Sequence, residues 1–323
     1  MQKESKQKIL ILKTGYSEFL DQETNTRKVS LGDILRTTVL LHPFKNKTVY
    51  WVTDEAGIPL LKGNPYITKI LPYDFTTILQ LEAEIFDTVI NLEKIPGICA
   101  LVDKIDAWQK HGFRFDKSTG KSEAYERAAE VLAVCSDQEL KKENKKYAQE
   151  LMYEVIGRRW NNEKYVLGYK PKSEITNDIG LNILVGEKWP NKQWSLDNWN
   201  SLENMLTKEG YKITSQDKQS KEVLNNLYSY MDWINSSRVI VSNDSLGLHL
   251  AIALNKPAIG LFGPTPSNEV CFYDKGKAII AEKDYSCIPC FKPTCIYAPE
   301  MISCMSLITP EKVFEETKSL LKY

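Results

Sequence analysis

The residues best suited to chemistry lie between positions 239 and 266, in the segment VIVSNDSLGLHLAIALNKPAIGLFGPTP. An apolar run typical of a buried strand ends at Asn243, and the residues that follow begin a helix. Backbone N–H groups at a helix start, together with the helix dipole, favour a bound phosphate. A carboxylate beside them can accept hydrogen bonds from a ribose or an amide. The candidate binding residues of this turn are Asp244, Ser245, Leu246, Gly247 and His249.

A second polar turn follows the next predicted strand and contains Gly263, Pro264 and Thr265. In a parallel sheet, ligands bind at the carboxyl ends of the strands, where neighbouring turns lie side by side. The two turns together therefore indicate a pocket for a diphosphate. Taken alone, Asp244 is explained more simply as a helix cap and His249 as a packed side chain. The pairing of the two turns favours the binding interpretation.

Four of the seven cysteines lie close together near the C-terminal end, with the spacing C-x2-C-x4-C-x8-C. Four thiolates that start with a C-x-x-C pair suit a tetrahedral metal site, which would be structural because protein ligands fill every position. Zinc and iron both stay open, as does the alternative of reduced, partly buried thiols. The candidate ligands are Cys287, Cys290, Cys295 and Cys304.

Short apolar runs alternate with helical stretches along the whole chain, and this alternation predicts parallel sheets covered by helices on both faces. Residues 122–159 are expected to form a long, charged helical stretch, after which the alternation restarts. The predicted strands of the first half are 8–13, 48–53, 67–73 and 87–92. Those of the second half are 180–186, 211–215, 238–243, 256–263 and 277–282.

The polar segment from Trp160 to Asn177 is the predicted linker between the two halves. The expected fold class is therefore α/β, with two Rossmann-like domains at residues 1–165 and 175–323, the second carrying the cysteine segment at 287–304. The length of 323 residues agrees with about two domains.

Lys plus Arg number 42 and Asp plus Glu number 42, so the formal net charge is zero. This balance disfavours a nucleic-acid-binding protein that works through overall positive charge. The sequence contains neither the apolar run of a secretory signal nor a window near the roughly 18 apolar residues of a transmembrane helix. It therefore predicts a cytoplasmic protein and leaves peripheral contact with a membrane open.

Three motifs, in order along the chain, resemble the bacterial heptosyltransferases of glycosyltransferase family nine. Val29–Leu41, VSLGDILRTTVLL, resembles the family's S-x-G-D-x-L-x-T-x-x-L stretch, and Trp189–Trp194, WPNKQW, resembles its W-P-x-K-x-W segment. The segment from Asp244 onward is similar to the family's nucleotide-sugar motif. The resemblance spans nearly the whole chain. It implies the GT-B fold and inverting, metal-independent transfer of a heptose from ADP-heptose to the lipopolysaccharide inner core.

The resemblance also implies roles for single residues. It makes Asp33 the catalytic base, places a donor-phosphate contact on Lys192, and makes Asp244 a donor-binding aspartate. Such a reaction needs a base for the acceptor hydroxyl and a counter-charge for the leaving diphosphate. No two aspartates stand two positions apart, as they do in metal-using transferases, so the counter-charge falls to Lys192, the helix start and Thr265. The alternatives are that Asp33 only caps a helix and that Lys192 only packs along indole rings.

The chain also departs from the family pattern. Leu246 stands where a glycine commonly follows the Asp-Ser pair, and Gly247 comes one position later. The polar stretch from Thr14 to Lys28 lengthens the loop before Ser30. These differences leave the mode of phosphate contact and the identity of the acceptor open.

The sequence thus predicts a heptosyltransferase that needs no cofactor for catalysis and holds a structural Zn or Fe at its cysteine cluster. An iron-binding four-cysteine finger occurs among the related autotransporter heptosyltransferases. One alternative is a transferase of the same fold with another nucleotide-sugar donor, or with a protein or small-molecule acceptor. The other is a catalytically silent nucleotide-sugar-binding protein.

Overall fold

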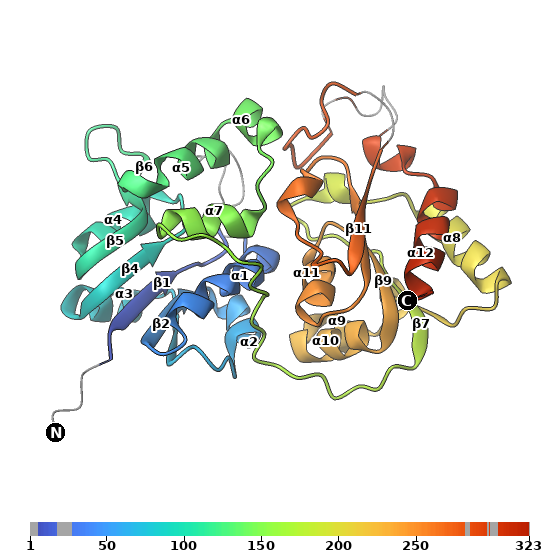
Figure 1. Cartoon of the computed structure of the whole chain (residues 1–323), viewed down its shortest axis with the longest axis horizontal. Helices are drawn as coiled ribbons and strands as arrows, with labels where there is room; N and C mark the ends of the chain where they lie inside the picture. The colour runs from blue at the N-terminus through green and yellow to red at the C-terminus, as the bar shows by residue number, and fades with distance from the viewer. Residues whose placement is uncertain (1–5, 18–27, 282–284, 296, 298–302, 323) are drawn as a thin grey trace. The chain divides into compact units, whose positions relative to one another are not determined.

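The computed structural model describes residues 6–17, 28–281, 285–295, 297 and 303–322. Most of the polar stretch that the sequence places between Thr14 and Lys28 lies outside these residues. The chain divides into two compact α/β units, Met1–Tyr169 and Lys170–Tyr323 (Figure 1). This division falls inside the segment 160–177.

The first unit is built on a six-stranded sheet with the strand order β3-β2-β1-β4-β5-β6. The pairs from β3 to β5 are parallel, whereas β6 runs antiparallel to β5. The order reverses between β1 and β4, which makes that pair the topological switch point of the sheet. The strands are β1 (Lys8–Leu12), β2 (Thr48–Thr53), β3 (Lys69–Pro72), β4 (Ile85–Asn91), β5 (Asp106–Phe115) and β6 (Ser122–Ala124).

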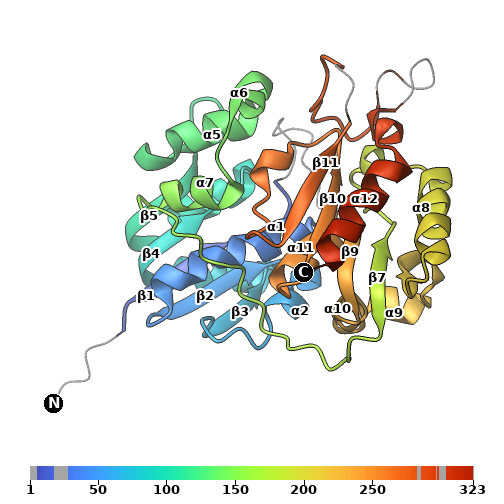
Figure 2. The ribbon, with the colours of Figure 1, turned by 45° about the vertical axis from the view of Figure 1, so that its right-hand side comes forward.

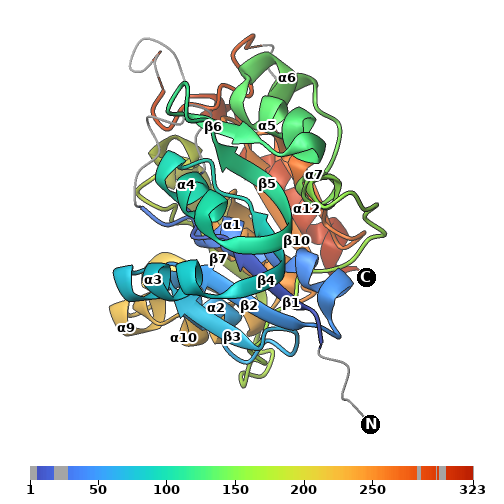
Figure 3. The same cartoon turned by 90° about the vertical axis from the view of Figure 1, so that its left-hand side faces the viewer.

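Helices cover both faces of this sheet. Leu10 and Leu12 of β1 pack in one core with side chains of α3 and α4, whereas Ile9 and Ile11 point to the opposite face, because side chains alternate along a strand. Figure 3 shows α3 and α4 on one side of the sheet and α7 on the other. The helices are α1 (Leu31–Thr37), α2 (Ile58–Leu61), α3 (Phe75–Ala83), α4 (Pro96–Lys104), α5 (Ala129–Ser136), α6 (Gln138–Glu143) and α7 (Ala148–Val155).

Two parts of the first unit differ from the sequence expectation. The stretch 122–159 is not one long helix: it contains β6 and three short helices. The Asp137 side chain accepts a hydrogen bond from the Leu140 N–H at 2.9 Å, so this residue caps a new helix instead of continuing the previous one. The ten-residue strand β5 was not predicted, because its sequence DAWQKHGFRF has no continuous apolar run. This strand can carry the exposed Trp108 and charged side chains because β6, its neighbour on that edge, is only three residues long and covers little of it.

The second unit is built on a parallel five-stranded sheet with the order β11-β10-β9-β7-β8. Figure 2 shows β11, β10, β9 and β7 in this sequence. Here the order reverses between β7 and β9. The strands are β7 (Asn177–Asn182), β8 (Ile213–Ser215), β9 (Ser237–Asn243), β10 (Ala258–Phe262) and β11 (Gly276–Ile280).

This sheet also lies between two helix layers. Side chains of α8 and α12 share a core with alternate residues of β7, β9 and β10, and α10 and α11 lie on the other side (Figure 1). Ser195 and Thr309 are hydroxyl residues directly before helical sequence patterns, which predicts that they cap helices. Both caps are present: Ser195 Oγ accepts from the Asn198 N–H, and Thr309 Oγ1 accepts from the Lys312 N–H. The helices are α8 (Leu196–Lys208), α9 (Lys221–Asn225), α10 (Leu227–Asn235), α11 (Leu246–Ala253) and α12 (Pro310–Leu321).

Among the described residues, no helix combines the length and the apolar character that crossing a membrane requires.

Candidate functional site

The polar turns of the second unit meet at the carboxyl ends of β9 and β10. Asp244 directly follows β9, Ser245 is the N-cap residue of α11, and Leu246 and Gly247 are the first residues of that helix. Gly263, Pro264 and Thr265 directly follow β10. Since β9 borders the switch point of its sheet, this is the edge at which doubly wound folds bind ligands.

One carboxylate joins the two turns to the Trp189–Trp194 segment. Asp244 Oδ2 lies 2.8 Å from Lys192 Nζ and accepts a hydrogen bond from Thr265 Oγ1 at 2.7 Å. His249 Nε2 lies 4.0 Å from the other oxygen, Asp244 Oδ1. The Lys192 ammonium also lies 4.9 Å from the centre of the Trp189 ring. Lys192, Asp244, His249 and Thr265 therefore form a single cluster, and Asp244 is not the cap of α11.

The electrostatics of this cluster favour an ionised carboxylate. Burial by itself would raise the pKa of Asp244, but the Lys192 ammonium and His249, with the Thr265 hydrogen bond, lower that pKa to about 2. The side chains of both Asp244 and Lys192 are only 11% exposed. A buried pair of this kind is stabilising only while both partners are present.

A buried network positions Ser245 and the start of α11. Asn182, at the end of β7, donates to Ser242 Oγ at 2.8 Å and to Ser245 Oγ at 2.9 Å, and it accepts a hydrogen bond from the Tyr230 hydroxyl. A Cβ atom at position 247 would lie 2.4 Å from the Asn182 side chain, so only a glycine fits there. The glycine that stands one position later than in the family pattern is therefore required by Asn182.

The Lys192 segment is fastened to the end of β9 by a neighbouring amide. The Asn243 side chain accepts a hydrogen bond from the Trp194 N–H at 3.2 Å and donates to the Ile183 carbonyl at 2.5 Å. The Trp194 ring is fully buried, and its Nε1–H donates to the Ile308 carbonyl. Lys192 thus extends from a short 3-10 turn, Pro190–Lys192, and the hydrogen bonds of Trp194 fix the chain that follows this turn.

The cysteine segment packs against both parts of this cluster. The Asn191 N–H donates to the Pro293 carbonyl at 3.0 Å, and the Phe291 N–H donates to the Pro264 carbonyl at 2.9 Å. A Cβ atom at Gly263 would lie 2.6 Å from Cys304 Sγ, which places that thiol directly beside the second turn. The segment therefore supports the residues next to Lys192 and Thr265, which are the two hydrogen-bonding partners of Asp244.

The four cysteines suit a thiophilic metal by atom type but not by arrangement. Burial raises the pKa of the Cys304 thiol to about 11, and the neighbouring Cys290 and Cys287 add to the effect. Within the described part of the chain, no three His, Cys, Asp or Glu side chains are arranged to hold a metal ion. Metal binding by Cys287, Cys290, Cys295 and Cys304 stays a prediction.

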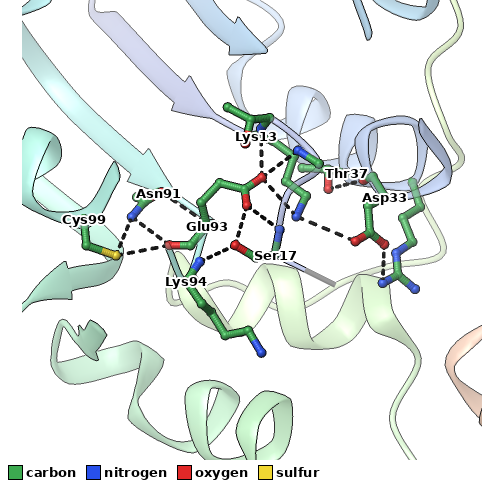
Figure 4. Close-up of polar contacts among 11 residues, drawn as sticks. Lys13, Ser17, Asp33, Thr37, Asn91, Glu93, Lys94 and Cys99 are labelled. Atoms are coloured by element: carbon green, nitrogen blue, oxygen red, sulfur yellow. Dashed lines mark hydrogen bonds and ion pairs between the residues drawn. The ribbon is translucent and has the colours of Figure 1, made fainter. Parts of the chain in front are cut away.

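The first unit holds a second charged cluster, around Asp33 of α1 (Figure 4). Asp33 is 7% exposed, and its Oδ1 lies 2.6 Å from Arg36 Nη2, one helical turn further on. Its Oδ2 lies 3.9 Å from Nζ of Lys13, which follows β1, and the same ammonium lies 3.4 Å from Glu93 Oε1. Asp33 occupies the third position of α1, whose N-cap is Ser30, so it is not the cap of this helix.

Glu93 is fully buried and fixes the chain that leaves β1. Its Oε1 accepts from the backbone N–H groups of Thr14 and Gly15 at 2.8 Å each, and its Oε2 accepts from the Ser17 N–H at 2.9 Å. Gly15 adopts a φ of +84°, and a Cβ there would lie 2.8 Å from the Ser30 carbonyl oxygen. One carboxylate thus fixes the conformation of residues 14–17 and approaches Lys13 as well.

Lys13, Glu93, Asn182 and Asn243 were not identified from the sequence, although all four stand at or just after the carboxyl end of a strand adjoining a switch point. The rule that singled out Asp244 applies to them equally. The residue type alone did not mark these positions, because the role of a lysine, a glutamate or an asparagine at a strand end depends on a partner far away in the sequence.

Chemically, the two clusters differ. The second unit offers an ammonium, a hydroxyl and a helix start, a combination suited to an anionic phosphate group. The first unit offers a buried carboxylate held in place by Lys13 and Arg36, and a positioned carboxylate is a candidate general base.

The chain is similar in sequence and in structure to known proteins. The chain is 25% identical over 311 residues to lipopolysaccharide heptosyltransferase 1 of Campylobacter coli, covering 80% of this chain and 90% of that one. It is 32% identical over 84 residues to lipooligosaccharide heptosyltransferase 2 of Campylobacter jejuni, and this match spans only 26% of that protein. The structure of the E. coli heptosyltransferase WaaC with ADP superposes with a TM-score of 0.64 at 14% identity, covering 97% of this chain and 99% of that chain.

The last similarity gives the architecture, two α/β units of the GT-B type. The model of glycosyltransferase family 9 (heptosyltransferase) matches residues 76–300, which is more than half of the chain and includes Lys192, Asp244 and Thr265. This chain therefore belongs to glycosyltransferase family 9, the heptosyltransferase family.

Proposed function

We propose that this protein transfers a heptose from ADP-heptose to a hydroxyl group of the lipopolysaccharide inner core, in the cytoplasm, with inversion and without a catalytic metal ion. In this proposal residues 1–165 bind the acceptor and residues 175–323 bind the nucleotide sugar. The observation that carries the proposal is the cluster of Lys192, Asp244 and Thr265 beside the start of α11. Family membership and the names of the similar proteins support the choice of heptose.

The reaction would proceed in one displacement. The acceptor oxygen attacks the anomeric carbon while its proton passes to the Asp33 carboxylate, and the bond from that carbon to the diphosphate oxygen breaks as ADP leaves. An attack from the side opposite the leaving group inverts the anomeric configuration. Lys192, the Thr265 hydroxyl and the N–H groups at the start of α11 would stabilise the charge that develops on the diphosphate.

The direct test is turnover of ADP-heptose with a truncated lipopolysaccharide core acceptor, followed through ADP release. A panel of UDP-, GDP- and other ADP-sugars runs in parallel, and protein and small-molecule acceptors replace the core in further arms. Turnover of another donor without turnover of ADP-heptose would refute the heptose assignment. No turnover of any donor by wild type would favour a silent binding protein.

The role of Asp33 is tested with Asp33→Asn, which keeps the shape of the side chain and removes its basicity. We expect kcat to fall by roughly 10²–10⁴, the usual contribution of a general base. The matched control is Asp74→Asn in the same unit. Asp74 caps α3 by accepting from the Thr77 N–H at 2.7 Å, and an asparagine caps equally well. Full activity of Asp33→Asn would rule out the base role.

A further inference from the structure

Lys13 lies between two carboxylates that come from different parts of the first unit. Its Nζ is 3.4 Å from Glu93 Oε1 and 3.9 Å from Asp33 Oδ2 (Figure 4). Lys13 is 5% exposed and Glu93 is fully buried. A buried lysine is costly unless its charge is matched, and here two carboxylates match it.

The charge of Lys13 is present at physiological pH. Burial alone would lower the pKa of Lys13, but the nearby Glu93 and Asp33 carboxylates outweigh that effect and raise it. An ammonium within about 4 Å of a carboxylate stabilises the ionised form of that carboxylate. Lys13 therefore acts on the protonation of Asp33 as well as on its position.

Glu93 limits this effect. A base surrounded only by cations would stay ionised but would be a poor acceptor for a proton, since its pKa would be very low. Arg36 already pairs with Asp33 at 2.6 Å, and the buried Lys94, whose pKa burial lowers to about 8, also interacts electrostatically with Lys13 and Asp33. Because the Glu93 charge offsets part of the Lys13 charge, Asp33 is kept ionised and held in place without a second uncompensated cation beside it.

We propose that Lys13, counterbalanced by Glu93, is a positioning residue that sets the basicity of Asp33 in sugar transfer. The proposal rests on the function proposed above. It places Lys13 outside contact with the substrate and makes the Lys13–Glu93 pair the link between the switch point of the sheet and the base in α1. The two charges of the pair should shift the pKa of Asp33 in opposite directions.

The test uses the full-length protein and two independent readouts. The first is the pKa of Asp33, followed by NMR of the carboxyl carbon in protein labelled with ¹³C-aspartate and assigned through the signal lost in Asp33→Asn. The second is the acid limb of the pH profile of kcat/KM. In Lys13→Met, both should move to higher pH by about one unit or more, the usual influence of a nearby opposite charge. In Glu93→Gln, both should move to lower pH.

Lys13→Arg keeps the charge and should keep the wild-type acid limb. The matched control is Lys8→Met, which removes another paired lysine from the same region, the partner of Glu84, and should leave the pKa of Asp33 unchanged. Should Lys13→Met fail to fold because Glu93 is left unpaired, the double variant Lys13→Met, Glu93→Gln replaces it. The acid limb of the double variant should still lie above that of wild type, because the lysine is the nearer of the two charges to Asp33.

The inference is overturned if Lys13→Met lowers kcat while the pKa of Asp33 and the acid limb stay at their wild-type values, since that pattern is a purely structural effect. It is also overturned if both single variants shift the pKa of Asp33 in the same direction. If wild type turns over no donor, the proposed function fails, but the NMR titration still decides whether Lys13 controls Asp33.

Discussion

Replacing Lys192 with methionine separates the electrostatic role of this residue from its packing. Methionine has nearly the length of the lysine stem and can remain over the Trp189 ring, where the ammonium lies 4.9 Å from the ring centre. The substitution removes the positive charge that lies 2.8 Å from Asp244 Oδ2. The remaining carboxylate is then buried beside the Thr265 hydroxyl and His249.

The expected loss of stability follows from the pKa of Asp244. This pKa is lowered from 3.8 to about 2, and the Lys192 charge is the strongest influence that lowers it. At about 1.4 kcal/mol per pKa unit, the difference corresponds to about 2.5 kcal/mol of the free energy of unfolding at neutral pH. Without the ammonium, burial raises the pKa instead, so Lys192→Met should lose at least about 2 kcal/mol.

The pH dependence has a defined sign. The pKa of Asp244 is lower in the folded state than in the unfolded state, so its contribution is complete above pH 3.8 and is lost as the pH falls through about 2. Lys192→Met lacks this contribution at every pH. The stability difference between wild type and variant should therefore be largest near neutral pH and should shrink as the pH falls from about 4 to about 2.

Urea unfolding followed by tryptophan fluorescence measures this difference, with one transition fitted for each unit because a two-unit chain need not unfold in a single step. The control is Lys208→Met, an exposed lysine of the same unit.

Calorimetric titration with ADP gives the functional readout, and we expect Lys192→Met to bind ADP about tenfold or more weakly, since a charge-assisted contact is worth about 1.5–3 kcal/mol. The reasoning is refuted if Lys192→Met matches wild type in stability, in its pH dependence and in ADP affinity.

Two further predictions concern the surroundings of this cluster. Gly247→Ala places a Cβ 2.4 Å from the Asn182 side chain, so we expect a loss of about 1–3 kcal/mol in stability together with weaker ADP binding; a Gly186→Ala control should show neither, since a Cβ there meets nothing within 4 Å. The cysteine spacing predicts bound Zn or Fe in the purified protein, and Cys290→Ser should reduce both the metal content and, through the contacts of its segment with Asn191 and Pro264, the affinity for ADP. Metal analysis checks the first point, and wild-type protein without Zn or Fe would contradict it.

The sequence predicted those parts of the fold that have a strong local signal. The strands that carry Asp244 and Thr265 are short apolar runs, and the helix caps Ser195 and Thr309 are hydroxyl residues directly before amphipathic helices. The turns that join these elements at the edge of a parallel sheet follow from topology alone. The cluster around Asp244 could therefore be anticipated from residue types and strand order.

The parts that were not predicted depend on long-range partners. Lys13 and Glu93 are 80 positions apart, and the two residues have no local pattern that links them. The same holds for Asn182 and the Tyr230 hydroxyl that it accepts from. The strand β5 was missed for a related reason: one of its neighbours is the three-residue β6, so its side chains are not uniformly apolar.

The zero net charge of the chain has a counterpart in both clusters. Lys192 is paired with Asp244, and Lys13 and Arg36 face Asp33 and Glu93, with the buried Lys94, whose pKa burial lowers to about 8, as a further lysine close by. Within such a buried cluster, the attraction between opposite charges offsets part of the cost of removing each ion from water. Each cluster would nevertheless change its balance during the proposed reaction, because a diphosphate adds negative charge near Lys192 and a proton neutralises Asp33. We therefore expect Lys192 and the Lys13–Glu93 pair to compensate for those changes in charge. Variants of these residues should change the pH dependence of transfer, an effect that the rate at a single pH does not reveal.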